Sequence, residues 1–176
     1  PPPLMAPLFF FNDSATTEIY ALSLPDGLPI SDRATRACTP QGVQLNDKQR
    51  AVIDKAFALI VENNLAAPMV YVHRDFMPRN LMVGPADGPL GVLDFQDAVH
   101  GPVTYDIASL MRDAFLSWDE EFVLDITVRY WERARKLGLM DFEDWHSDFG
   151  SFWAAVEWLG LQRHLKAAGI VSRIRR

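Results

Sequence analysis

The pattern of hydrophobic and polar positions changes character near residue 45. Residues 1–45 contain seven of the twelve prolines and show neither a helical nor a strand period, which predicts a poorly ordered lead-in. From Asn46 onward, apolar residues recur with periods that change from one short stretch to the next. The pattern therefore predicts one folded unit over residues 46–176.

The folded unit is predicted to begin with a helix from Asn46 to about Asn63. Asn46 and Gln49 have the spacing of a capping box, in which each side chain accepts a hydrogen bond from the other residue's backbone. The apolar face of this helix is expected to comprise Val52, Ala56, Phe57, Ile60 and Val61.

Short β-rich runs follow this helix. Residues 69–73 are predicted to form one strand. Residues 81–83 and 90–93 are predicted to form two more, joined by the turn-forming stretch GPADGP. Such a hairpin would return Asp94, after its second strand, to Asn80, before its first.

Helical patterns fill the rest of the chain. Ser117 and Glu120 have capping-box spacing, and Gly138 and Gly169 are expected to end helices. The predicted helices cover residues 105–117, 118–138 and 141–169.

The apolar positions of the last two helices are predicted to be core. They are Val123, Ile126, Tyr130, Ala134, Leu137, Phe142, Trp145, Phe149, Phe152, Val156 and Leu159. The basic residues Arg163, His164 and Lys166 are interpreted as a cluster placed favourably near a helix end.

Composition narrows the classes of protein that fit. A net charge of −6 argues against nucleic-acid and anionic-membrane partners. The single Cys38 cannot form an internal disulfide, which favours a reducing, cytoplasmic location. The opening PPPLMAPLFFF lacks the basic start of a signal peptide, and no apolar run is long enough to cross a bilayer. The oligomeric state leaves no mark on the sequence.

The stretch VYVHRDFMPRNLMV, followed by GVLDFQD, carries the candidate chemistry. Phosphoryl transfer needs a carboxylate that orients a hydroxyl and accepts its proton, together with oxygen ligands for the magnesium ion of a nucleotide. Asp75 follows a predicted strand, Asn80 lies five residues later, and Asp94 ends the predicted hairpin. These three residues could therefore serve one divalent ion and one incoming alcohol.

The segments HRDFMPRN and LDFQD, continued by GPVTYDIASLMRDAF, resemble the aminoglycoside phosphotransferase-like kinases, relatives of the protein kinases. The resemblance covers residues 46–176. It implies an α+β, mainly helical fold: the C-terminal lobe of a protein-kinase-like enzyme, with a short β-hairpin carrying the active-site loops. It also implies ATP and Mg²⁺ as cofactors.

Carried over by position, the resemblance makes Asp75 the catalytic base, and Asn80 and Asp94 the ligands of the nucleotide-bound magnesium. Removing a positioned base typically costs about 10²–10⁴ in rate.

Four further residues receive supporting roles from the same reasoning. His73 resembles a residue that props the catalytic loop, and Asp106 resembles a helix-borne carboxylate that holds the loop backbone. Arg79 is a candidate for contact with a nucleotide phosphate, or a solvated loop arginine. Asp97 is a further candidate near Asp94, or a surface carboxylate.

The acceptor is expected to be a small molecule, because Met77 stands where many protein kinases have a loop lysine. The motifs are most similar to those of bacterial anomeric kinases of N-acetylmuramate and N-acetylglucosamine, which act in cell-wall recycling. An amino sugar is therefore the expected substrate, and an aminoglycoside or another small alcohol is the alternative. Gln96 replaces the glycine of the usual D-F-G, so the flipping loop of regulated protein kinases is not expected.

Two readings from other classes stay open. His73, Asp75, Asp94 and Asp97 could form a metal-dependent hydrolase site, although Asn80 would then have no role. A non-catalytic binding fragment that keeps the motifs is the other reading.

Residues 12–30 resemble the conceptual translation of a DNA-sequencing adapter, with agreement at fifteen of nineteen positions. Residues 1–45 are therefore expected to be a non-native, adapter-derived segment standing where the N-terminal lobe would be. That lobe would carry the glycine-rich loop and the phosphate-binding lysine, so this chain is expected to show little turnover. The ending GIVSRIRR is expected to be a truncated C-terminus.

Overall fold

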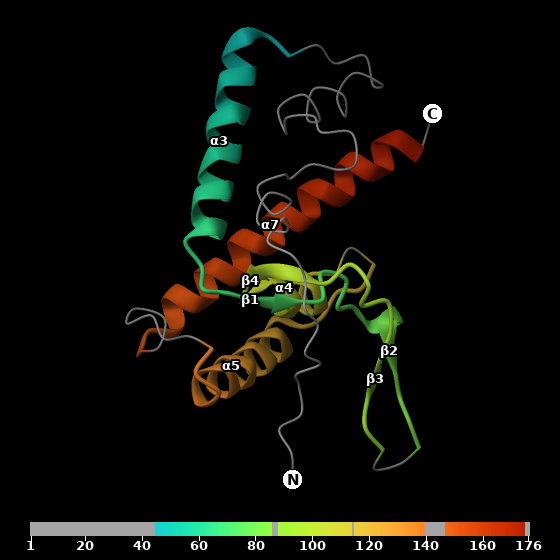
Figure 1. Cartoon of the computed structure of the whole chain (residues 1–176). Coiled ribbons are helices and arrows are strands. Elements are labelled where there is room, and N and C mark those ends of the chain that lie inside the picture. The colour runs from blue at the N-terminus through green and yellow to red at the C-terminus, as the bar shows by residue number, and fades with distance from the viewer. Residues whose placement is uncertain (1–44, 86–87, 114, 140–146, 175–176) are drawn as a thin grey trace.

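The computed structural model describes residues 45–85, 88–113, 115–139 and 147–174 (Figure 1). The predictions for residues 1–44 lie outside this part of the chain. The described elements are α3 (Asp47–Leu65), β1 (Met69–Val72), the 3₁₀ turn η2 (Pro78–Asn80), β2 (Leu81–Met82), β3 (Gly91–Val92), β4 (Val99–Pro102), α4 (Tyr105–Met111), α5 (Glu120–Lys136) and α7 (Phe149–Ile174). The structure is mainly helical with two small antiparallel sheets, as expected.

Helix α7 is the central element, and it packs against α3, α4 and α5 (Figure 1). Phe152 of α7 is 0% exposed and lies in a cluster of buried apolar residues that forms the hydrophobic core of the described part of the chain. The other members of this cluster are Val103, Ile107, Ala108, Met111, Val123, Ala134, Val156 and Leu159. Most of the predicted helical core positions are therefore confirmed. Leu137 is an exception, since it is 47% exposed beyond the last turn of α5. Phe142 and Trp145 lie outside the described residues.

Helix α3 begins with the predicted capping box. The Gln49 backbone N–H donates to Asn46 Oδ1 at 2.9 Å, and the Asn46 N–H donates to Gln49 Oε1 at 3.0 Å. The predicted apolar face is only partly confirmed, because Ile60 is buried whereas Val52 is 70% exposed. Figure 1 shows the reason: the C-terminal half of α3 approaches α7, and its N-terminal half rises away from the other described elements.

The sheets contain the predicted strands and one that was missed. β2 pairs with β3 in the expected hairpin, with Leu81 opposite Val92. β1 pairs with β4, with Met69 opposite Pro102 and Val72 opposite Val99. Strand β4 was not predicted, because the short stretch AVHGPV carries no clear alternation, and its pairing with β1 stabilises it from a distance.

Of the boundaries of α5 and α7 that were predicted from capping residues and glycines, two are wrong and one is confirmed. Helix α5 begins after Asp119, whose side chain makes no capping hydrogen bond, so the Ser117–Glu120 capping box does not form. Gly138 has φ 69° and ends α5 as predicted. Helix α7 runs through Gly169 to Ile174, because a glycine that keeps helical dihedral angles weakens a helix without ending it.

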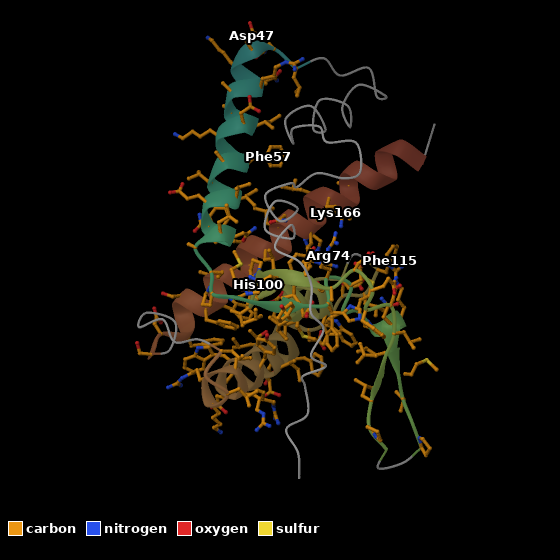
Figure 2. The ribbon with its side chains drawn as sticks, viewed as in Figure 1. Asp47, Phe57, Arg74, His100, Phe115 and Lys166 are labelled. Carbon is orange, nitrogen blue, oxygen red and sulfur yellow. The ribbon has the colours of Figure 1, made fainter. Side chains whose placement is uncertain are left out.

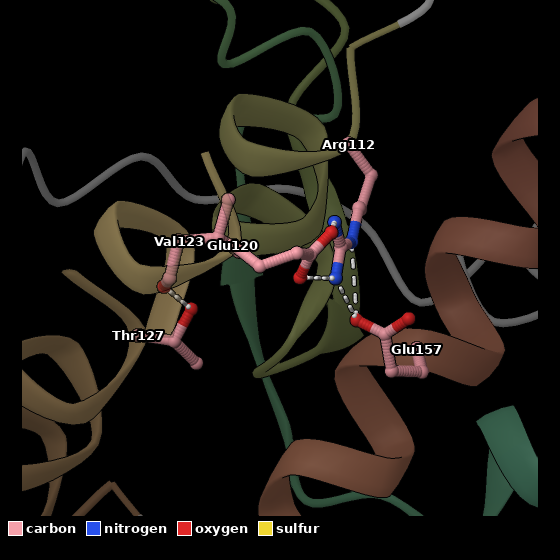
Figure 3. A network of polar contacts seen from close by, with 5 residues as sticks. All are labelled: Arg112, Glu120, Val123, Thr127 and Glu157. Carbon is pink, nitrogen blue, oxygen red and sulfur yellow. Dashed lines mark hydrogen bonds and ion pairs between the residues drawn. The ribbon is translucent and has the colours of Figure 1, made fainter. Parts of the chain in front are cut away.

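Helix α4 is shorter than predicted and ends at Met111, where Arg112 leaves the helical conformation. The Arg112 guanidinium lies between two carboxylates, 2.7 Å from Glu120 and 2.6 Å from Glu157 (Figure 3). Hydrogen bonds to Glu120 are the main cause that raises the pKa of Arg112. This network ties the end of α4 to α5 and α7. Gly160 allows the close approach, since a Cβ there would lie 3.0 Å from Arg112 Cγ.

Within the described ranges, every helix is too short or too polar to serve as a transmembrane span.

Candidate active site

The loop between β1 and η2 carries the candidate base, Asp75. Buried side chains anchor it at both sides, because Val72 at the end of β1 is 2% exposed and Met77 is 6% exposed. The apolar Met77, in the position where many protein kinases have a lysine, therefore belongs to the core under the loop. Asp75 and the neighbouring Arg74 (Figure 2) are partly exposed between these anchors.

Asp106, on the first turn of α4, holds the start of this loop. Its two carboxylate oxygens accept the backbone N–H of His73 at 2.8 Å and that of Arg74 at 3.0 Å. Burial raises the pKa of the Asp106 carboxyl, while these hydrogen bonds and the nearby Arg163 cation oppose the rise. A carboxylate that accepts two backbone N–H groups forms strong, charge-assisted hydrogen bonds. This contact has the geometry that a loop-holding carboxylate requires.

The backbone is strained at two of the motif residues. Arg74 has φ 74° and Asp94 has φ 67°, and they are the two non-glycine residues with positive φ among those described. Such a conformation costs on the order of 1–3 kcal/mol and persists only where the surroundings over-determine it. Asp tolerates it better than Arg, so the strain is greater at Arg74.

His73 joins the catalytic loop to the strand end that leads to Asp94. Its Nε2–H donates to the Leu93 carbonyl at 2.9 Å, and its ring packs edge-on against Phe76 with centroids 6.0 Å apart. Its Nδ1 is buried and finds no hydrogen-bond partner among the described residues. His73 is therefore placed as a brace between two segments of the site.

Asn80 and Asp94 lie on neighbouring chain segments. Asn80 Nδ2 donates to the Asp75 carbonyl at 2.8 Å, and the Leu93 N–H donates to the Asn80 carbonyl at 2.9 Å. The β2–β3 hairpin thus brings Asp75, Asn80 and Asp94 together at the level of the backbone.

The oxygen atoms of the Asn80 and Asp94 side chains are suitable ligands for a hard cation. The amide nitrogen of Asn80 donates to the Asp75 carbonyl, so the Oδ1 of Asn80 is the atom of this side chain that could bind a cation. Asp94 is exposed, and its Oδ1 accepts Gln96 Nε2 at 2.5 Å. One amide oxygen and one carboxylate are the ligand types that Mg²⁺ takes beside nucleotide phosphates.

Arg79 and Asp97 are placed beside the loop and not within this junction. The Arg79 side chain is exposed, with its guanidinium carbon 5.8 Å from the ring centroid of Phe115. Asp97 is exposed, and its backbone carbonyl accepts Arg74 Nη1 at 3.3 Å. The proposed roles of both side chains stay predictions.

The sequence missed two contacts to the loop. The Arg74 carbonyl accepts Arg163 Nη1 at 3.0 Å, and the Ser109 hydroxyl lies 3.3 Å from it while making a shorter contact of 2.8 Å to the Tyr105 carbonyl. Ser109 lies three residues after Asp106 on the same helical face, a spacing that could have indicated it. Arg163 gave no local signal. It lies well inside α7, so its interpretation as part of a helix-end cluster is wrong.

Across the described part of the chain, no three His, Cys, Asp or Glu side chains gather as a metal-binding group.

The sequence profile of the phosphotransferase enzyme family matches residues 22–141. A Neisseria meningitidis serogroup B protein named N-acetylmuramate/N-acetylglucosamine kinase is 51% identical over 133 residues, which are 76% of this chain and 38% of that protein. Proteins of the same name from Pseudomonas putida and Pseudomonas aeruginosa are 45% and 46% identical, with the same shares covered. The chain therefore spans about 38% of the length of the relatives that it matches.

Proposed function

Because the chain belongs to the phosphotransferase enzyme family, we propose that it forms the catalytic-loop part of an ATP-dependent kinase that phosphorylates an amino sugar. The relatives' shared name supports N-acetylmuramate or N-acetylglucosamine as the acceptor. The observation that carries the proposal is the hydrogen-bonded junction of the Asp75, Asn80 and Asp94 segments. The helical core with its short β-hairpin corresponds to the C-terminal lobe of a protein-kinase-like fold.

In this proposal Asp75 orients the acceptor hydroxyl and takes its proton as the hydroxyl oxygen attacks the γ-phosphorus of ATP, while the bond from that phosphorus to the β,γ-bridging oxygen breaks and ADP leaves. Asn80 and Asp94 would hold Mg²⁺, which neutralises phosphate charge when bound. His73 and Asp106 keep the loop in place through the Leu93 carbonyl and the loop N–H groups. The protein thus contributes mainly position and charge.

The test uses a chimera in which this chain's matching segment replaces the corresponding 133-residue stretch of the Neisseria relative. We expect Asp75→Asn to lower kcat by about 10²–10⁴. ATP binding should persist, because the substitution removes the base and leaves the proposed metal ligands. ADP release is measured with ATP and a panel of amino sugars, an aminoglycoside and simple alcohols.

Asp119→Asn is the matched control, since Asp119 is exposed and makes no side-chain cap at α5. It should leave kcat unchanged. Normal turnover in Asp75→Asn would contradict the assignment of the base. Metal-dependent ester cleavage without nucleotide would favour a hydrolase.

A further inference from the structure

We propose that Arg163 is a positioning residue for phosphoryl transfer: from helix α7, its guanidinium fixes the peptide unit that joins Arg74 to Asp75. The inference rests on the proposed function, because it takes Asp75 as the base. It deepens that proposal by assigning a role to a residue of α7 that lies 89 positions after Arg74 in the sequence.

The hydrogen bonds around Arg74 fix both of its peptide units. On one side, its N–H donates to Asp106 Oδ1 at 3.0 Å. On the other, its carbonyl accepts Arg163 Nη1 at 3.0 Å. The Ser109 hydroxyl lies 3.3 Å from the same carbonyl, but its single proton has a shorter partner in the Tyr105 carbonyl at 2.8 Å. Because a peptide unit is planar, the carbonyl of Arg74 and the N–H of Asp75 turn together. Arg163 therefore sets the direction in which the chain enters Asp75.

The positive φ of Arg74 makes such a restraint necessary. At φ 74° the residue is in a conformation that its side chain disfavours, and it would relax by rotating one of its two peptide units. Asp106 blocks the rotation of the first unit, and Arg163 blocks the second. Arg163 is the stronger restraint on this carbonyl, because it is charged and 3.0 Å away, whereas Ser109 is 3.3 Å away and is closer to the Tyr105 carbonyl at 2.8 Å.

Arg163 is itself held in place for this contact. Its guanidinium carbon lies 5.5 Å from the ring centroid of Tyr105, and its Nε is buried without a hydrogen-bond partner among the described residues. Leaving a buried donor unpaired is unfavourable. The contacts with the loop carbonyl and the Tyr105 ring therefore fix the position of the Arg163 side chain, even though one of its own donors, Nε, stays unpaired among the described residues.

The kinetic test compares Arg163→Met, which keeps an apolar stem and removes the donors, with Arg163→Lys, which keeps a cationic donor. In the chimera described above, we expect the Met variant to lower kcat about 10- to 100-fold, with KM for ATP and for the sugar nearly unchanged, because misplacement of a catalytic group costs rate. The Lys variant should recover part of that loss. Lys166→Ala removes a charge from an exposed position of the same helix and should match the parent.

A second measurement does not depend on turnover. In the full 176-residue chain, amide hydrogen exchange of His73 and Arg74 should become about tenfold faster in Arg163→Met, while the amides of α5 keep their rates. Equal acceleration in α5 would show a general stabilising role and overturn the proposal. Should the Met variant not fold, the same comparison is made with Arg163→Gln, whose shorter, uncharged side chain loses the guanidinium contact to the Arg74 carbonyl; unchanged exchange together with unchanged kcat in that variant overturns the proposal.

The two proposals fail in different ways. A chimera that is inactive on every acceptor, or active without Asp75, removes the proposed function, while the exchange measurement still decides whether Arg163 holds the loop. An active chimera in which Arg163→Met keeps the parental kcat overturns the positioning role alone. A rise in KM with unchanged kcat would do the same, since it would place Arg163 in substrate binding.

Discussion

Asp106 keeps a partly buried carboxylate beside the loop because two backbone N–H groups bind it. Burial nevertheless dominates and raises its pKa, so the charged form is held at some cost. The same carboxylate accepts the backbone N–H of Arg74, which has a strained positive φ. Arg163 donates to the carbonyl of Arg74. At the scale of single residues, the site is a set of strained or buried groups that restrain one another.

The raised pKa of Asp106 predicts a pH dependence of stability. The folded state binds the proton of the Asp106 carboxyl more tightly than the unfolded state does. In the unfolded state the pKa of this carboxyl is near 3.8. The penalty on the folded state is therefore full above the raised pKa and fades as the pH falls from that pKa toward 3.8. We expect wild-type protein to gain stability relative to Asp106→Asn as the pH falls through this window. Urea unfolding at stepped pH measures the difference.

Asp125→Asn serves as the control for that experiment, because Asp125 is an exposed partner of Arg129 on α5. Its stability difference from wild type should not follow the same slope. A difference between wild type and Asp106→Asn that stays constant with pH would contradict burial as the dominant influence on this carboxyl.

Helix α7 carries the packing that connects the elements. Its buried face supplies Phe152, Val156 and Leu159 to the core, and its polar positions reach Arg112 through Glu157 and the loop through Arg163. Helix α3 contributes less, since much of its N-terminal half is exposed. The stability of the described fold should therefore be more sensitive to α7 than to α3.

Substitutions on the two helices test this difference. Phe152→Ala should lower the free energy of unfolding by about 3–5 kcal/mol, because it removes a fully buried ring and leaves a cavity. Val52→Ala on the exposed part of α3 should change it by less than about 0.5 kcal/mol. Urea denaturation of both variants gives the comparison, and similar losses would contradict the dominance of α7.

At the scale of the whole molecule, the chain spans about 38% of the length of its relatives. A kinase must hold ATP against the base as well as provide the base. We expect the 176-residue chain by itself to bind ATP weakly and to give little turnover with amino sugars, whereas the chimera turns over. Coupled measurement of ADP release compares the two. Turnover of the unmodified chain at about 1–100 s⁻¹, an ordinary kinase rate, would contradict this expectation.

Features encoded within a few neighbouring residues were predictable from the sequence. The Asn46–Gln49 capping box, the β2–β3 hairpin and the end of α5 at Gly138 each depend on local hydrogen bonds or local dihedral angles. The order of Asp75, Asn80 and Asp94 around that hairpin was predictable for the same reason. The local rule that a glycine ends a helix failed at Gly169. This residue keeps the helical conformation, and α7 continues past it to Ile174.

The sequence by itself determined the local elements and the identity of the family, because turns, caps and motif spacings are short-range. Only the tertiary structure decided that residues 99–102 pair with β1, that α4 ends at Met111, and that Arg163 binds the loop carbonyl. Those contacts join segments far apart along the chain. Each is stabilised by groups that no local pattern specifies, so they follow from the packing of the whole fold.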